Sequence, residues 1–111
     1  MQIDEQRQGA VTVVKPIGAL VGADAEQFKK HVAEVVGRSL GRFVVDASAV
    51  PFLDSRGLEV LVEVSADLAE SGQMLRLCGE GETLRETLEL TETARYFEHY
   101  QDVQTAVRSF L

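Results

Sequence analysis

The segment that carries the most chemistry is Asp54-Ser55-Arg56-Gly57-Leu58, which follows a short loop and opens an apolar stretch. It places a hydroxyl between a carboxylate and a guanidinium at the expected start of a helix. Free N–H donors and about half a positive charge gather at a helix N-terminus, and both favour a phosphate there. A structural interpretation is also open, with Ser55 as an N-cap and Gly57 as a packing compromise costing about 1 kcal/mol relative to alanine.

Catalysis by Ser55 would need a base beside it, and the chain offers only His31 and His99 for that role. Ser55 does not lie in a Gly-x-Ser-x-Gly elbow, so the sequence predicts a protein that is not an enzyme. The histidines and the single cysteine, Cys78, lack the spacing of a metal site, and we expect neither a metal nor a cofactor. Cys78 itself is expected to be a small buried apolar residue.

Two glycine-containing segments resemble nucleotide-binding loops only superficially. Residues 18–22 read Gly-Ala-Leu-Val-Gly, which is not Gly-x-Gly-x-x-Gly, and the chain is too short for two mononucleotide-binding halves. Residues 79–82 read Gly-Glu-Gly-Glu, and these carboxylates would repel a phosphate. We therefore interpret residues 18–22 as a flexible turn into a helix.

Length and charge narrow the class of protein. The chain has 111 residues, which fit one domain, and its formal net charge is -7. The acidic balance argues against partners with a phosphate backbone and against anionic lipid. Residues 1–7 lack the apolar core of a secretion signal. The longest run without charged or strongly polar side chains, residues 16–23, is far shorter than the roughly 20 residues of a membrane span. We expect a soluble cytoplasmic protein without nucleic-acid or membrane partners.

The elements that position Ser55 follow from local patterns. Apolar and β-branched runs predict strands at residues 3–7, 10–17, 42–47, 74–78 and 96–100. Helical spacing of apolar residues and capping signals predict helices at residues 24–37, 55–71, 82–90 and 102–109. Asp24 is the expected N-cap of the first helix, and a capping box from Thr83 to Glu86 is expected to open the third.

The order β β α β α β α β α predicts the fold class. Strands separated by helices pair in parallel through right-handed crossovers, whereas the first two strands form an antiparallel hairpin around Gln8-Gly9. The result is a single α/β domain, residues 1–111, with a mixed, mostly parallel sheet covered by helices. The residues predicted to be largely buried are Phe28, Val32, Val44, Leu58, Leu61 and Leu68.

A strand that ends Val-Val-Asp at Asp46, followed by Asp54-Ser55-x-Gly57-Leu58, resembles the signature of the STAS domain in the family of anti-sigma factor antagonists. The order of the expected elements matches that fold over nearly the whole chain. In that family, the serine directly after the aspartate is phosphorylated by a partner kinase that is also the anti-sigma factor. The resemblance therefore implies that Ser55 is the phosphoacceptor.

The resemblance also implies a partner-binding surface formed by Asp24, Asp54, Ser55, Arg56, Gly57 and Leu58. The chain departs from the family pattern near this surface. Ala19 and Val21 stand where the family often has acids, Arg56 where it has a second Ser or Thr, and Glu59 where Gly is common. These changes alter the charge around the docking site, so they leave the identity of the partner open.

The leading hypothesis is a regulatory protein-interaction module that binds an anti-sigma factor or a related ATP-using serine kinase. Phosphorylation of Ser55 would switch binding, because desolvating a dianion in an interface is costly. The helix end and Arg56 could hold the phosphate locally, while Asp54 would oppose it. The alternative is a non-phosphorylated STAS subunit of a lipid-transport complex or signalling scaffold, which the missing acids at Ala19 and Val21 favour. A small enzyme with Ser55 as its nucleophile is the third hypothesis.

Overall fold

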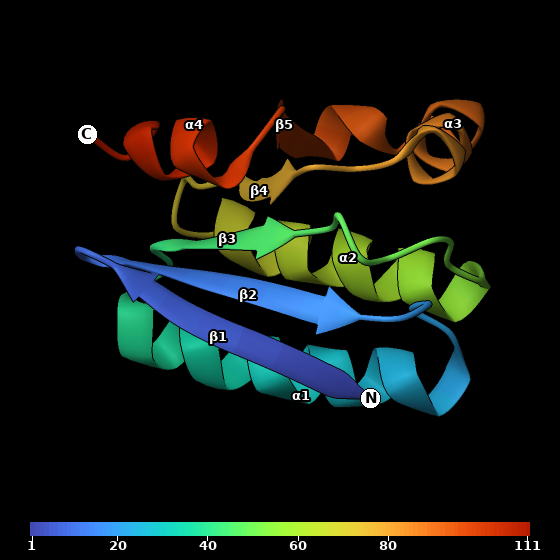
Figure 1. The fold of residues 1–111 in the computed structure, drawn as a ribbon, viewed down its shortest axis with the longest axis horizontal. Helices are drawn as coiled ribbons and strands as arrows, with labels where there is room; N and C mark the ends of the chain where they lie inside the picture. Colours follow the sequence, from blue (N-terminus) through green and yellow to red (C-terminus); the bar gives the residue numbers. More distant parts are fainter.

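The computed structural model describes residues 1–111 and folds them into one sheet with helices on both faces (Figure 1). The elements in chain order are β1 (Gln2–Gln8), β2 (Val11–Ile17), α1 (Gly22–Ser39), β3 (Phe43–Asp46), α2 (Ser55–Ala69), β4 (Leu75–Cys78), α3 (Glu82–Leu90), a 3-10 turn (Ala94–Tyr96), β5 (Phe97–Tyr100) and α4 (Val103–Arg108). Apart from the 3-10 turn, this is the predicted order.

The sheet has the spatial order β1-β2-β3-β4-β5. β1 and β2 form an antiparallel hairpin, and every other neighbouring pair is parallel. This confirms the predicted α/β fold with a mixed, mostly parallel sheet. The hairpin turn lies at Gly9 and Ala10, one residue later than predicted, and Gly9 has a φ of 64° there. Glycine adopts such a positive φ without steric cost.

Side chains that alternate along the strands divide the core between the two faces of the sheet. Val14, Val45 and Leu77 belong to the larger cluster, which also holds the apolar faces of α1, α2 and α3. Val44 and Cys78 point the other way, into a smaller cluster with Ala106 of α4. Figure 1 accordingly shows α4 separated by the strands from α1 and α2.

Five of the residues predicted to be in the core are buried, namely Phe28, Val32, Val44, Leu61 and Leu68. The prediction is wrong for Leu58, which is only partly buried because it packs at the margin of the larger cluster. Cys78 is buried as predicted, and desolvation is the main cause that raises the pKa of its thiol to about 12. None of the helices combines the length and apolar composition that crossing a bilayer requires.

The predicted N-caps of α1 and α3 are wrong, although α3 starts at Glu82 and ends at Leu90 as predicted. Asp24 is not the N-cap of α1: the helix begins at Gly22 with Val21 as its N-cap, and the Asp24 carboxylate lies 3.4 Å from the amino group of Met1. The φ of 48° at Gly22 lets the chain turn into the helix before Asp24 is reached. Likewise α3 begins at Glu82 rather than after a Thr83 cap, and no side chain caps it.

Candidate functional site

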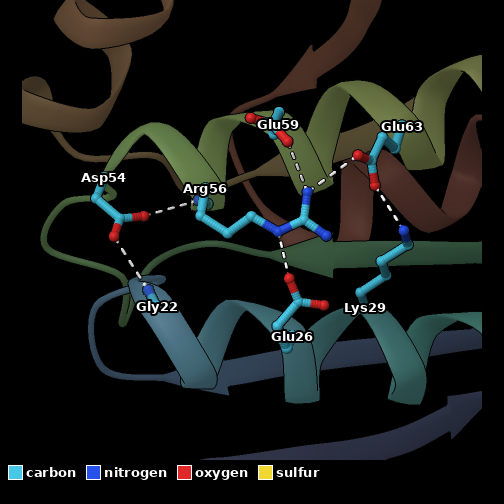
Figure 2. A network of polar contacts seen from close by, with 8 residues as sticks. Gly22, Glu26, Lys29, Asp54, Arg56, Glu59 and Glu63 are labelled. Carbon is cyan, nitrogen blue, oxygen red and sulfur yellow. Dashed lines mark hydrogen bonds and ion pairs between the residues drawn. The ribbon is translucent and has the colours of Figure 1, made fainter.

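Asp54 holds the start of α2 against the start of α1. It is the N-cap of α2, and its Oδ1 accepts a hydrogen bond from the backbone N–H of Gly57 at 2.8 Å. Its Oδ2 accepts one from the backbone N–H of Gly22, in the first turn of α1, at 3.0 Å (Figure 2). These bonds, the one from Gly57 foremost, lower the pKa of the Asp54 carboxyl. One ionised side chain therefore fixes two helix N-termini relative to each other.

Ser55 is the first residue of α2, and it is exposed. The N-cap role considered for Ser55 belongs instead to Asp54, so the Ser55 hydroxyl is not used to satisfy the helix end. The first N–H groups of a helix have no partner within it, and they create a favourable field for an anion. The hydroxyl is thus exposed at the N-terminal end of α2, directly after the Asp54 carboxylate that caps the helix.

The loop before Ser55, residues 47–54, is attached to the loop after β2. The backbone N–H of Leu20 donates to the carbonyl of Phe52 at 3.2 Å, and the N–H of Asp54 donates to the carbonyl of Leu20 at 3.3 Å. These bonds form an isolated parallel bridge between Leu20 and Leu53. The expectation of a flexible turn at residues 18–22 is therefore wrong, because this segment supports the serine loop through backbone hydrogen bonds.

Gly57 is buried and makes this close approach possible. A Cβ at Gly57 would lie 2.1 Å from the carbonyl oxygen of Leu20 and 3.0 Å from the Cβ of Leu53. The backbone that approaches Gly57 closely thus belongs to the chain itself. Gly57 shapes the site from within, and its burial leaves it no surface to offer a partner.

The side chain of Arg56 points away from Asp54 and along α2 (Figure 2). Its Nε pairs with Glu26 of α1, and its Nη1 lies 2.8 Å from Glu59 and 3.0 Å from Glu63. These carboxylates, Glu26 foremost, raise the pKa of the guanidinium further above its already high ordinary value. Lys29 of α1 adds a 2.7 Å contact to Glu63. Arg56 therefore joins α1 to α2 and is not placed to neutralise a phosphate on Ser55.

Phe52 lies in the same loop, and 51% of its surface is exposed. Phe52 was missed as a candidate, although an aromatic residue between Pro51 and Leu53 in a loop was the available signal. Glu26, Lys29 and Glu63 were also missed, because only the packing of α1 against α2 brings them to Arg56. The exposed surface next to Ser55 thus combines the aromatic ring of Phe52 with the carboxylate of Asp54.

Neither histidine is bonded to Ser55. Nε2 of His31 lies 2.6 Å from Glu5 of β1, and His99 pairs with Glu80 at 2.6 Å and with the Ala94 carbonyl at 2.7 Å. No group of three His, Cys, Asp or Glu side chains is arranged to hold a metal ion. The geometry therefore gives Ser55 neither a general base nor a metal for use as a nucleophile.

Solved structures that resemble this chain share its fold. A putative anti-sigma factor antagonist from Thermotoga maritima is 23% identical, with a TM-score of 0.87 over 96% of this chain and 92% of that one. The unphosphorylated anti-sigma factor antagonist SpoIIAA is 13% identical, with a TM-score of 0.76 over 98% and 96% of the two chains. SpoIIAA has also been solved in a phosphorylated form from Bacillus, at 13% identity and a TM-score of 0.71 over 99% and 100%.

A different kind of protein contains the same fold. The murine anion transporter solute carrier 26 family member A9 is 18% identical and has a TM-score of 0.76. That match covers 95% of this chain but only 18% of the transporter chain. No curated protein sequence matches the chain. The family model for the STAS domain matches residues 2–106, so the chain belongs to the STAS domain family.

Proposed function

We propose that this chain is a regulatory module that binds a protein partner through residues 47–54 and the start of α2, and that phosphorylation of Ser55 weakens the binding. The observation that carries the proposal is the exposed Ser55 hydroxyl at the N-terminus of α2, next to an exposed Phe52. Asp54 and the Leu20 bridge fix this surface, so a modification need not change the backbone to act. The fold, shared with anti-sigma factor antagonists, supports an anti-sigma factor or related serine kinase as the partner.

Electrostatics explains why phosphorylation of Ser55 would weaken, rather than strengthen, binding of the partner. A phosphoserine carries about -1.5 to -2 charges at neutral pH, and this surface is already acidic. Arg56 is bonded to Glu26, Glu59 and Glu63, so it leaves the phosphate charge largely uncompensated. A partner that covers a neutral hydroxyl would instead have to desolvate a dianion, which is costly. Arg56 therefore does little to soften this repulsion.

The test starts with affinity purification of the native protein from its own cells, followed by identification of its partners and mapping of phosphosites. The binding of the recovered partner is then measured with purified wild type, Ser55→Ala and Ser55→Asp. Ser55→Ala should bind like wild type and take up no phosphate, and Ser55→Asp should bind more weakly. Ser71→Asp, at an exposed position beyond the other end of α2, is the matched control and should bind like wild type.

Equal affinity for the wild type, the Ala variant and the Asp variant would overturn the switch. The non-phosphorylated STAS subunit of a lipid-transport complex or signalling scaffold would then take its place. The presence of the fold within an anion transporter, together with Ala19 and Val21 at positions where acids are frequent, favours that second function. Its signature would be a transport or scaffold partner recovered with Ser55 unmodified.

A further inference from the structure

A cavity of about 490 Å³ lies between α3, the 3-10 turn and the end of β5. This size falls within the roughly 300–1,000 Å³ range of small-molecule sites. Gly79 and Glu80, directly after β4, line it together with Tyr100 and Gln101 at the end of β5. It therefore lies outside the carboxyl ends of two parallel strands, the edge at which open α/β sheets usually bind ligands.

Glu80 supplies a buried carboxylate to the wall of this cavity. Its side chain is only 4% exposed, and its Oε2 lies 2.6 Å from Nδ1 of His99. No hydrogen bond within the protein reaches its other oxygen, Oε1. A carboxylate can accept about four hydrogen bonds, and Oε2 uses only some of this capacity. Glu80 thus retains acceptor capacity that a ligand with N–H donors would use.

His99 holds Glu80 in place and is itself fully engaged. Its Nε2 lies 2.7 Å from the carbonyl oxygen of Ala94. A carbonyl oxygen only accepts, so Nε2 carries a proton, and the short contact between Nδ1 and the Glu80 carboxylate needs a second proton between these two atoms. His99 therefore compensates the charge of Glu80 on the side of Oε2. Both ring nitrogens are therefore occupied by the protein. His99 is a positioning residue, and the groups left for a ligand are elsewhere in the cavity.

Arg85 supplies the opposite charge at the exposed side of the cavity. Its Nη2 donates to the backbone carbonyl of Glu80 at 3.0 Å, which anchors the guanidinium at the wall of the cavity. Arg85 forms no ion pair, so its remaining N–H donors are available. Leu88 and Ala94 add an apolar wall. The cavity thus places a buried anion, an anchored cation and apolar contacts around one volume.

We propose that this cavity binds a small zwitterion of the free amino acid class, with the ligand ammonium on Glu80 and its carboxylate on Arg85. A simple amine would leave Arg85 unused, and a simple carboxylic acid would face both Glu80 and Glu89. The side chain of the amino acid would contact Ala94 and Tyr100, which also line the cavity. This site is separate from Ser55 and does not depend on the switch.

The test titrates the full-length, 15N-labelled protein with each of the standard L-amino acids and follows the backbone amides of Gly79, Glu80 and Gln101 by NMR. We expect saturable shifts at these amides with at least one amino acid. For leucine, the matched probes are isopentylamine, which lacks the carboxylate, and 4-methylpentanoate, which lacks the amine. Each ligand that lacks one charge should bind roughly tenfold to a hundredfold more weakly than its parent amino acid.

Variants then assign the contacts. Arg85→Gln and Glu80→Gln should each weaken binding by roughly tenfold to a hundredfold, whereas Glu86→Gln on the same helix and Arg7→Gln on β1 should not. Arg85 is exposed, so its variant decides the outcome even if Glu80→Gln fails to fold. The proposal is overturned if no amino acid gives saturable shifts, if Arg85→Gln binds like wild type, or if the amine alone binds as tightly as the amino acid.

Discussion

Gly57 shows how one residue type can be dictated by a contact rather than by helix propensity. Glycine in a helix interior is about 1 kcal/mol less favourable than alanine. The chain accepts this because the Leu20 carbonyl occupies the space that a Cβ would need. The serine loop can therefore lie directly on the β2–α1 connection, which positions Ser55.

We expect Gly57→Ala to destabilise the fold by about 1–3 kcal/mol in urea unfolding, because the clash outweighs the gain in helix propensity. Gly37→Ala is the matched control, since it lies within α1 with open space where its Cβ would be. That variant should gain about 0.4–1 kcal/mol. Equal effects of the two substitutions would show that the contact between Leu20 and Gly57 is not formed.

Asp54 makes a second prediction at the residue scale. Asp54→Ala should lower the melting temperature by several degrees, and by more than Asp102→Ala. Asp102 also caps a helix, through Thr105 N–H at 2.8 Å, but joins no second one. Calorimetry of both variants at neutral pH measures the difference. A larger loss for Asp102→Ala would argue against the bond between Asp54 and Gly22.

The pH dependence of Asp54 follows from its lowered pKa in the folded protein. The stability that the Asp54 carboxylate contributes is fully present above its pKa in the unfolded chain, near 3.8. It is lost as the pH falls through the lower pKa of Asp54 in the folded protein. The melting temperatures of wild type and Asp54→Ala should therefore converge in acid. A constant difference down to low pH would contradict the ionised role of Asp54.

At the scale of elements, α1 and α2 are joined by charge as well as by apolar packing. Arg56 and Lys29 face the carboxylates of Glu26 and Glu63 across the two helices (Figure 2). Networks of this kind fix orientation more than they add stability, because partly exposed pairs are screened by water and salt. Here they determine how the helix that carries Ser55 lies against its neighbour.

We expect Arg56→Gln to reduce stability at neutral pH and low salt, because it leaves Glu26, Glu59 and Glu63 close together without their shared cation. Arg56 lowers the pKa of both the Glu26 and the Glu63 carboxyl; it is the main cause for Glu26 and comes second to Lys29 for Glu63. The stability that these two carboxylates contribute is therefore lost as the pH falls through their pKa values in the folded protein. The difference from wild type should shrink in acid and in high salt. Unfolding curves at several pH values and salt concentrations measure this.

Arg7→Gln, at an exposed arginine on β1 without an ion pair, is the control and should behave like wild type. If Arg56→Gln proves as stable as Arg7→Gln at low salt, then Arg56 does not join the two helices in solution.

At the scale of the whole molecule, the radius of gyration of 12.5 Å is that of a compact domain of this length. One core cluster unites residues from β2, β3, β4 and β5 with those from α1, α2 and α3. The βα connections lie together at the carboxyl edge of the sheet (Figure 1). The exposed surface at Ser55 and the cavity next to Glu80 therefore lie at two parts of the same edge of the sheet.

Leu61 tests this common core, because it is 2% exposed and belongs to the larger cluster. Leu61→Ala should destabilise the domain by about 2–5 kcal/mol in chemical denaturation. Leu90→Ala, at a side chain that is 77% exposed, should change stability by less than about 0.5 kcal/mol. A loss below about 1 kcal/mol for Leu61→Ala would place Leu61 outside the core.

The sequence by itself determined the elements, their order and the parallel sheet, because periodicity, strand propensity and glycine turns act over a few neighbouring residues. It also determined that Ser55 begins a helix, since Asp54 and the apolar spacing after it are local signals. The helix start at Gly22 was missed because it depends on a backbone φ, which residue type alone does not specify.

Only the tertiary structure decided what surrounds these residues. The partner of Gly57 is Leu20, that of Arg56 is Glu26, and that of Glu80 is His99, each pair far apart in the chain. Such contacts depend on how whole helices and strands pack, and no short-range pattern records them. The fold brings Leu20 against the loop before Ser55 and pairs Arg56 with Glu26, so the geometry around Ser55 was settled by packing rather than by local sequence.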